Sequence, residues 1–218
     1  MFPNCMNASH LRQTLVYVAG AIHREEAYLT SLDSAIGDGD HGITMRLGFQ
    51  AVREKMNGLA ESAGMDDILR GAGVAFMGAA GGAIGVLLGK MLMAAGASLK
   101  GKQEMGAAEF RDLLGSMEAA LVAAGKVKPG DKTLLDAVHG ANQALTAGLP
   151  QDLVGALKKA AEGARLGAES TAQMPARVGR SSRLGDRALG HPDPGATSFY
   201  LILRSMGEFV EAQSPSAQ

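Results

Sequence analysis

The stretch Leu32-Asp-Ser-Ala-Ile-Gly-Asp-Gly-Asp-His-Gly42 places three carboxylates and one imidazole within nine residues. Glycines on both sides of Asp38 let the backbone turn sharply, because glycine adopts positive φ at little cost. Residues 43–52 follow with the apolar spacing of a helix. We therefore expect Asp33, Asp38 and Asp40 to converge in a loop that leads into a helix N-terminus.

Carboxylates this close together repel one another unless a cation neutralises them, and three hard oxygen donors suit Mg²⁺. A helix N-terminus beside them offers free N–H groups to an anion. The combination favours a divalent metal next to phosphate. The alternative is an ordinary surface turn in which Asp33 caps a helix. A calcium EF-hand is excluded, because Gly42 and Phe49 fall at the fifth and twelfth positions counted from Asp38, where such a loop needs oxygen ligands.

The composition favours a helical enzyme. The chain has 218 residues, enough for a well-buried core, and 46% of them are hydrophobic while only 4% are aromatic. Ala, Gly, Leu and Met supply most of the bulk, which favours closely packed helices over a β-sandwich or barrel. A formal net charge of −1 gives no electrostatic reason to expect nucleic acid or an acidic membrane as a partner. The single Cys5 excludes an intrachain disulfide, and the sequence starts without a basic segment followed by an apolar one, so a cytoplasmic protein is expected.

One stretch is long enough to suggest a membrane span. Residues 71–89 contain no charged side chain over 19 positions. Seven of these residues are glycine, however, and no aromatic belt or basic flank accompanies them. We therefore expect a buried, glycine-rich turn and helix.

Apolar periodicity predicts about eight helices in a single domain over residues 1–218, with an ordered core over about 10–210 and a frayed tail over 213–218. Asp66 and Asp67 are expected to cap the third helix. No strand pair is evident. The expected helices cover residues 9–30, 41–59, 66–78, 83–99, 107–124, 132–147, 151–174 and a last one that ends near 210.

Three further segments carry residues of chemical interest. Gly78-Ala-Ala-Gly-Gly-Ala-Ile-Gly85 brings glycines to a helix start, where N–H groups can approach a phosphate, although close helix packing explains them equally well. No Gly-Lys-Ser/Thr follows, so this is not a Walker A loop. Asp131, in Gly130-Asp-Lys-Thr133, is expected to cap the following helix rather than to act in catalysis. Four arginines between Arg177 and Arg187 can clamp phosphate oxygens or form a solvated basic loop.

The order of these segments resembles the nucleotide-binding L subunit of dihydroxyacetone kinases. The resemblance runs from about residue 10 to 210 and implies an all-α fold, an antiparallel barrel of eight amphipathic helices with the nucleotide bound at one end. It rests on Asp33-Ser-Ala-Ile-Gly-Asp-Gly-Asp-His-Gly42, Gly81-Gly82, Gly130-Asp-Lys-Thr133, and Gly179-Arg180 with Gly190-His-Pro-Asp-Pro-Gly-Ala-Thr197.

The resemblance also implies a set of site residues. Asp33, Asp38 and Asp40 would hold two Mg²⁺ ions against the phosphates of ADP or ATP, and Arg180 would reach a phosphate and join them in catalysis. Ile84 stands where the family usually has Ser, so a side-chain hydroxyl is lost there, and Thr44 replaces the usual Asn. The remaining cofactor-binding positions would be His41, Gly42, Thr44, Gly81, Gly82, Ala83, Thr133, Leu134, Asp193, Pro194 and Gly195.

The implied function is phosphoryl transfer to a short ketose. A separate K subunit would hold dihydroxyacetone covalently through a histidine, so activity would need that partner. A phosphotransferase-system M subunit would rephosphorylate an ADP that stays bound as a cofactor. Three alternatives stay open: an ATP-dependent kinase subunit for a related short sugar such as a tetrose, a catalytically impaired nucleotide-binding regulatory subunit, and a metal-binding helical scaffold without nucleotide.

Overall fold

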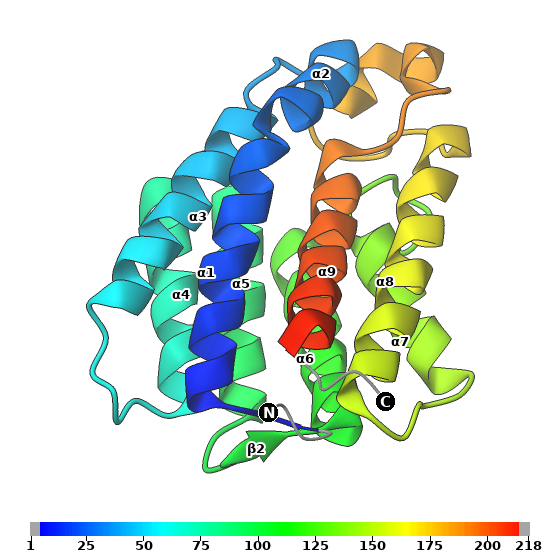
Figure 1. Ribbon diagram of the computed structural model, residues 1–218. Helices are drawn as coiled ribbons and strands as arrows, with labels where there is room; N and C mark the ends of the chain where they lie inside the picture. The colour runs from blue at the N-terminus through cyan, green and yellow to red at the C-terminus, as the bar shows by residue number, and fades with distance from the viewer. Residues whose placement is uncertain (1–4, 214–218) are drawn as a thin grey trace.

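The computed structural model describes residues 5–213, and most of them lie in helices (Figure 1). Two very short strands, β1 (Met6–Asn7) and β2 (Glu104–Met105), pair antiparallel, which the sequence did not indicate. The α-helices of this part of the chain are α1 (Ala8–Arg24), α2 (Glu26–Ile36), α3 (His41–Asn57), α4 (Met65–Ala79), α5 (Gly82–Ser98), α6 (Ala107–Gly125), α7 (Leu134–Thr146), α8 (Leu153–Ser170) and α9 (Pro194–Gln213), and its 3₁₀ helices are η1 (Thr171–Gln173) and η2 (Ser181–Ala188).

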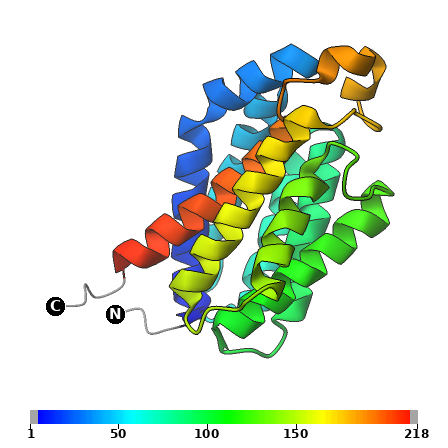
Figure 2. The ribbon, with the colours of Figure 1, turned by 90° about the vertical axis from the view of Figure 1, so that its right-hand side faces the viewer.

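Eight of the α-helices form a closed barrel. Around it, α1, α3, α4, α5, α6, α7, α8 and α9 each contact the next, and α9 contacts α1. The ninth, α2, lies across one end of the barrel beside η2 (Figures 1 and 2). One hydrophobic cluster takes residues from all nine helices, including Leu11, Phe76 and Phe199. The expected all-α barrel of about eight helices is thus confirmed.

The corner between α1 and α2 differs from the expected single helix over 9–30. The chain bends at Glu25, and neither glycine nor proline marks the bend, so the apolar spacing continues through it. Arg204 of α9 donates to the Glu25 carboxylate (2.9 Å), and the Cα of Gly42 in α3 packs against the backbone of α2. Tertiary contacts therefore set this corner, and they bring Asp33 over the end of the barrel.

Two of the expected helix caps are wrong. The N-cap of α4 is Gly64. Asp66 and Asp67 lie in the first turn, where their negative charges interact favourably with the helix dipole. Asp131 does not cap α7, because its carboxylate accepts a hydrogen bond from the backbone N–H of Lys128 (2.9 Å).

The N-cap of α7 is Thr133, so this helix begins two residues later than expected. The Thr133 hydroxyl accepts from the N–H of Leu135 (3.2 Å), and the Asp136 carboxylate accepts from the N–H of Thr133 (2.7 Å). At the other end of the chain, Gln213 is the last residue of α9, and the rest of the expected tail lies outside the described residues.

Glycines allow several helix pairs to approach closely. The uncharged stretch over 71–89 forms the end of α4 and the start of α5, where a Cβ on Gly73 would lie 2.6 Å from the carbonyl oxygen of Gly89. On the other side of the barrel, a Cβ on Gly163 of α8 would overlap the carbonyl oxygen of Gly140 in α7. Between residues 5 and 213, no helix is both long and apolar enough to cross a membrane.

Because of the close contact between α7 and α8, replacing Gly163 by alanine should destabilise the fold, although helix propensity alone would predict stabilisation. Gly163→Ala should gain about 1 kcal/mol in propensity but lose more to overlap with Gly140, for a net destabilisation of about 1–3 kcal/mol in urea unfolding. Gly115→Ala is the matched control, because nothing lies within 4 Å of a Cβ at that position of α6, and it should be neutral or stabilising. Equal effects of the two substitutions would contradict this account of the packing.

Candidate functional site

Four helices begin at the end of the barrel that α2 covers (Figure 1). Their first turns line one pocket. The pocket has a volume of about 590 Å³. Its wall includes the first turns of α3, α5, α7 and α9, represented by Thr44, Ala83, Leu134 and Gly195. Each helix N-terminus carries a partial positive charge and N–H groups without a partner in the helix. The pocket is therefore suited to an anion.

At three of these four N-termini, a side chain of the protein accepts from a backbone N–H group. The Asp33 carboxylate accepts from the N–H of His41 at the start of α3 (3.2 Å). Thr133 caps α7, and the Asp193 carboxylate accepts from the N–H of Ala196 in the first turn of α9 (2.8 Å).

The N-terminus of α5 has no such partner. Its N-cap is Gly81, which offers no side chain, and Gly82 follows with φ of +68°, a left-handed conformation that favours glycine. Nothing lies within 4 Å of where a Cβ would stand on either residue. The first-turn N–H groups of α5 are thus open to a ligand in the pocket.

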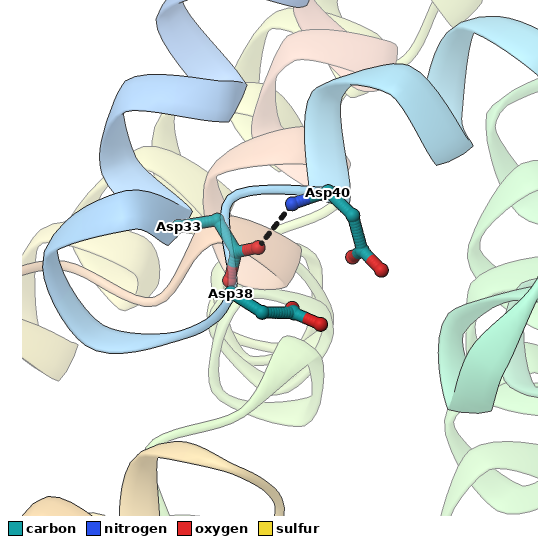
Figure 3. Close-up of side chains that lie close together, drawn as sticks. All are labelled: Asp33, Asp38 and Asp40. Carbon is teal, nitrogen blue, oxygen red and sulfur yellow. Dashed lines mark hydrogen bonds between the residues drawn. The ribbon is translucent and has the colours of Figure 1, made fainter.

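Three carboxylates face this pocket together: Asp33 lies in the last turn of α2, not in the loop as expected, and Asp38 and Asp40 lie in the loop that follows. Asp33, Asp38 and Asp40 each bring an oxygen within 4.8 Å of the others (Figure 3). Asp33 also accepts from the N–H of Asp40 (3.0 Å), so it both caps α3 and belongs to the acidic cluster. The loop requires its glycines, because a Cβ on Gly37 would overlap the Asp33 carboxylate and Gly39 has φ of +75°.

Arg180 supplies a positive charge to the acidic cluster. It comes from the segment just before η2, about 140 residues further along the chain. Its guanidinium forms an ion pair with Asp38 and lies 3.4 Å from Asp40. The hydrogen bond with Asp38 raises the pKa of the guanidinium, which stays charged. The predicted phosphate clamp and the predicted metal ligands therefore share one site.

His41 ties the start of α3 to α9. Its Nε2 lies 2.7 Å from the hydroxyl of Ser198, which donates its own proton to the carbonyl oxygen of Pro194 (3.0 Å). The imidazole nitrogen is therefore the donor in the first of these bonds. Burial lowers the pKa of His41, while Asp33 and Asp40 partly oppose this.

Nearly all the sequence-predicted site residues line the pocket. Gly42 is the exception: its Cα faces α2, where a Cβ would overlap the Glu26 carbonyl and the Thr30 hydroxyl. Its role in the structure is close helix packing. The predicted residues in the pocket wall are Asp33, Asp38, Asp40, His41, Thr44, Gly81, Gly82, Ala83, Thr133, Leu134, Arg180, Asp193, Pro194 and Gly195.

Part of the pocket wall is apolar, and sequence reasoning missed it. Leu121, Ala124 and Gly125 at the end of α6 form it together with Val127. These residues form no motif, because their apolar spacing looks like that of any buried helix face. Ile84, in the first turn of α5, also lines the pocket and packs against the core.

The carboxyl group of Asp193, in the pocket wall, has a raised pKa. Burial raises its pKa from 3.8 to about 6, although the N–H of Ala196 and the Lys132 ammonium both oppose this. The ionised carboxylate is thus more costly in the folded chain than in the unfolded one.

Comparison with known proteins gives concordant matches. The DAK2 domain family matches residues 35–208. The ADP-binding subunit DhaL of PEP-dependent dihydroxyacetone kinase 2 from Listeria innocua is 34% identical over 200 residues, which cover 91% of this chain and 93% of that protein. The corresponding subunit of Escherichia coli is 36% identical over 184 residues, which cover 84% and 87%.

Two longer proteins match over about a third of their length. D-erythrulose kinase of Mycolicibacterium smegmatis is 38% identical over 200 residues, which cover 88% of this chain and 34% of that enzyme. The crystal structure of dihydroxyacetone kinase from C. freundii matches with a TM-score of 0.69 and 24% identity, over 95% of this chain and 35% of that one. This last likeness shows the fold.

The raised pKa of Asp193 predicts how a substitution will change stability with pH. In Asp193→Asn the amide oxygen can still accept from Ala196, but the charge is gone. Above about pH 6 the variant should be more stable than the parent chain by at most about 3 kcal/mol. As pH falls from about 6 towards 4, the folded parent takes up its proton before the unfolded chain does, so its stability rises and the difference disappears.

Urea unfolding without metal or nucleotide, at about pH 7.5 and about pH 4.5, checks this expectation. Asp112→Asn, which removes an exposed carboxylate of α6, is the control and should show no comparable change with pH. A stability difference for Asp193→Asn that is the same at both pH values would be inconsistent with the raised pKa.

Proposed function

This chain belongs to the DAK2 domain family, and on that premise we propose that it is the nucleotide-binding L subunit of a split, cytoplasmic dihydroxyacetone kinase. One observation carries the proposal: an acidic cluster and an uncapped helix N-terminus face the same pocket. The cluster attracts cations, and the helix end attracts an anion. A metal-bound polyphosphate meets both needs.

Asp33, Asp38 and Asp40 are the metal ligands in this proposal. Three carboxylate oxygens within 4.8 Å of one another are a donor set of the kind that Mg²⁺ prefers, and together the three groups offer enough oxygens for two ions. When bound, Mg²⁺ neutralises the phosphate oxygens and holds them in place. The carboxylates of Asp38 and Asp40 are about half exposed, so a hydrated ion can reach them.

Other residues bind and orient the nucleotide. The open N–H groups at Gly82 and Ala83 donate to phosphate oxygens, and Arg180 is a charged donor in the same pocket. The apolar part of the wall near Leu121 and Val127 takes the nucleoside and excludes water from it. Phosphoryl transfer needs mainly this positioning and charge neutralisation, because the charge is spread over several oxygens. His41, Thr44, Thr133, Leu134, Asp193, Pro194 and Gly195 complete the proposed site.

In this proposal a partner subunit binds the ketose. A K subunit holds dihydroxyacetone, and the two subunits act together. Relatives that match over nearly their whole length are named as ADP-binding subunits of PEP-dependent kinases, which favours a bound ADP that a phosphotransferase-system M subunit recharges in place.

A second candidate is an ATP-dependent kinase subunit for a tetrose, which the 38% identity to D-erythrulose kinase favours. Mass spectrometry of the nucleotide released on denaturing the purified chain separates the two. Retained ADP supports the cofactor form, whereas an empty site that exchanges free ATP supports the ATP-dependent form.

Removing one carboxylate of the cluster should abolish metal-dependent nucleotide binding. Asp38→Asn leaves the loop geometry in place and relieves charge repulsion, so the metal-free variant should fold. Isothermal titration should show that its affinity for ADP with Mg²⁺ falls at least about 100-fold, the loss expected when one hard ligand of a shared metal site is removed.

Asp112→Asn, an exposed carboxylate outside the pocket, is the matched control and should bind as the parent chain does. Unchanged ADP–Mg²⁺ affinity in Asp38→Asn would refute the assignment of the metal ligands.

Ile84 is the position where a hydroxyl would add a donor to the phosphate loop. Ile84→Ser should tighten ADP–Mg²⁺ binding or accelerate transfer by about tenfold, the effect of one hydrogen bond to a charged group. Ile84→Ala removes the same apolar contacts without adding a hydroxyl, and it should not show this gain. If the Ser and Ala variants bind and turn over alike, the backbone alone serves the phosphate at this loop.

A further inference from the structure

Residues 174–190, here called the lid, leave the barrel after η1 and return just before α9. The two ends of the lid lie side by side. The N–H of Gly190 donates to the carbonyl oxygen of Ala172 (2.8 Å), and the N–H of Asp193 donates to the hydroxyl of Thr171 (2.8 Å). The lid therefore leaves and rejoins the barrel at one place. Between its ends it is also held by the N–H of Arg177, which donates to the carbonyl oxygen of Asp131 (3.2 Å), and by the contact of η2 with α2.

Lys132 is buried at this point, although lysine is rarely fully buried in proteins. Only 1% of its surface is exposed. Its ammonium donates to the carbonyl oxygen of Thr171 and to that of His191, each at 2.5 Å. One charged group thus joins the two ends of the lid, through charge-assisted bonds that are stronger than those of a neutral donor.

The backbone of Lys132 is specialised for this contact. Its φ is +61°, in the left-handed region that residues with a side chain rarely adopt. The Asp136 carboxylate fixes the turn on both sides, accepting from the N–H of Gly130 (2.5 Å) and from that of Thr133 (2.7 Å). A conformation of this kind persists where its surroundings over-determine it. The turn directs the ammonium to the lid and places Thr133 in the pocket wall.

Packing alone does not explain a charged group at this position. Burial lowers the pKa of the Lys132 amine, while the nearby carboxylates of Asp193 and Asp136 partly raise it. An apolar side chain of similar length would fill the space without the cost of removing an ammonium from water. The two bonds to the lid ends, together with the attraction of Asp193 and Asp136, offset this cost.

We propose that Lys132 is a positioning residue that clamps both ends of the lid and thereby holds Arg180 against the acidic cluster. The clamp itself is a property of the folded chain. Its effect on ligand binding rests on the proposed function, in which the lid closes over a metal-bound nucleotide.

Trypsin cleavage of the lid tests the clamp without any ligand. In Lys132→Met, cleavage within the lid should be at least about tenfold faster than in the parent chain, while cleavage elsewhere is unchanged. Lys159→Met is the matched control, because Lys159 also donates to a carbonyl, that of Gly148 (2.6 Å), away from the lid. It should leave lid cleavage unchanged. The cleavage sites are Arg177, Arg180, Arg183 and Arg187.

A chemical rescue separates the clamp from a loss of general stability. Lys132→Cys, made in a Cys5→Ser background, is alkylated under denaturing conditions and refolded. Bromoethylamine produces a side chain with the length and charge of lysine and should restore protection of the lid, whereas iodoacetamide, which adds a neutral amide, should not. Equal lid cleavage in the two adducts, or parental lid cleavage in Lys132→Met, would overturn the proposal.

Hydrogen exchange of the parent chain tests whether the lid ends are held even if the variants do not fold. The N–H of Gly190 should exchange as slowly as those of α9, while residues 181–188 exchange faster. Exchange of Gly190 as fast as that of residues 181–188 would show that the lid ends are not held.

Adding ADP and Mg²⁺ in a separate arm distinguishes the two proposals. If the clamp behaves as expected but the parent chain does not bind ADP, the proposed function fails and the clamp stands. If the parent chain and Lys132→Met bind ADP–Mg²⁺ equally well, Lys132 does not position the site.

Discussion

The convergence of four helix N-termini on one pocket is the constraint on which this site depends. Their partial positive charges favour an anion at that end of the barrel. Asp33, Thr133 and Asp193 each accept from a backbone N–H group at one of three of these helix ends. Only α5 keeps its first turn open, because glycines stand where a capping side chain would be. The fold thus reserves one helix end for a ligand.

Under the proposed function, the acidic cluster requires a ligand that binds together with cations. Asp38 and Asp40 would repel a bare phosphate, and in this structure the single positive charge of Arg180 offsets only part of their negative charge. Metal ions between the carboxylates and a polyphosphate would leave the guanidinium to bind phosphate oxygens instead. In this account the lid supplies a positive charge and the acidic cluster supplies negative charges to the same pocket.

Apolar spacing predicted the helices, because it is a local pattern. Their arrangement as a barrel was implied by the resemblance to a known family. The glycines around Asp38 and the spacing of the carboxylates were sufficient to predict a convergent cluster. Asp33 fits both interpretations of that loop, since it caps α3 and also joins the cluster. The bend at Glu25 was missed because Arg204 of a distant helix fixes it. The apolar part of the wall near Leu121 was missed because it has no motif.

The central claim is that metal and phosphate meet at the acidic cluster. Electron–nuclear double resonance with Mn²⁺ in place of Mg²⁺ tests it directly, because the method detects phosphorus nuclei close to the ion. With the purified chain and ADP, we expect a phosphorus coupling to Mn²⁺ that is absent in Asp38→Asn. A protein-bound Mn²⁺ signal without phosphorus coupling in the presence of saturating ADP would contradict the account.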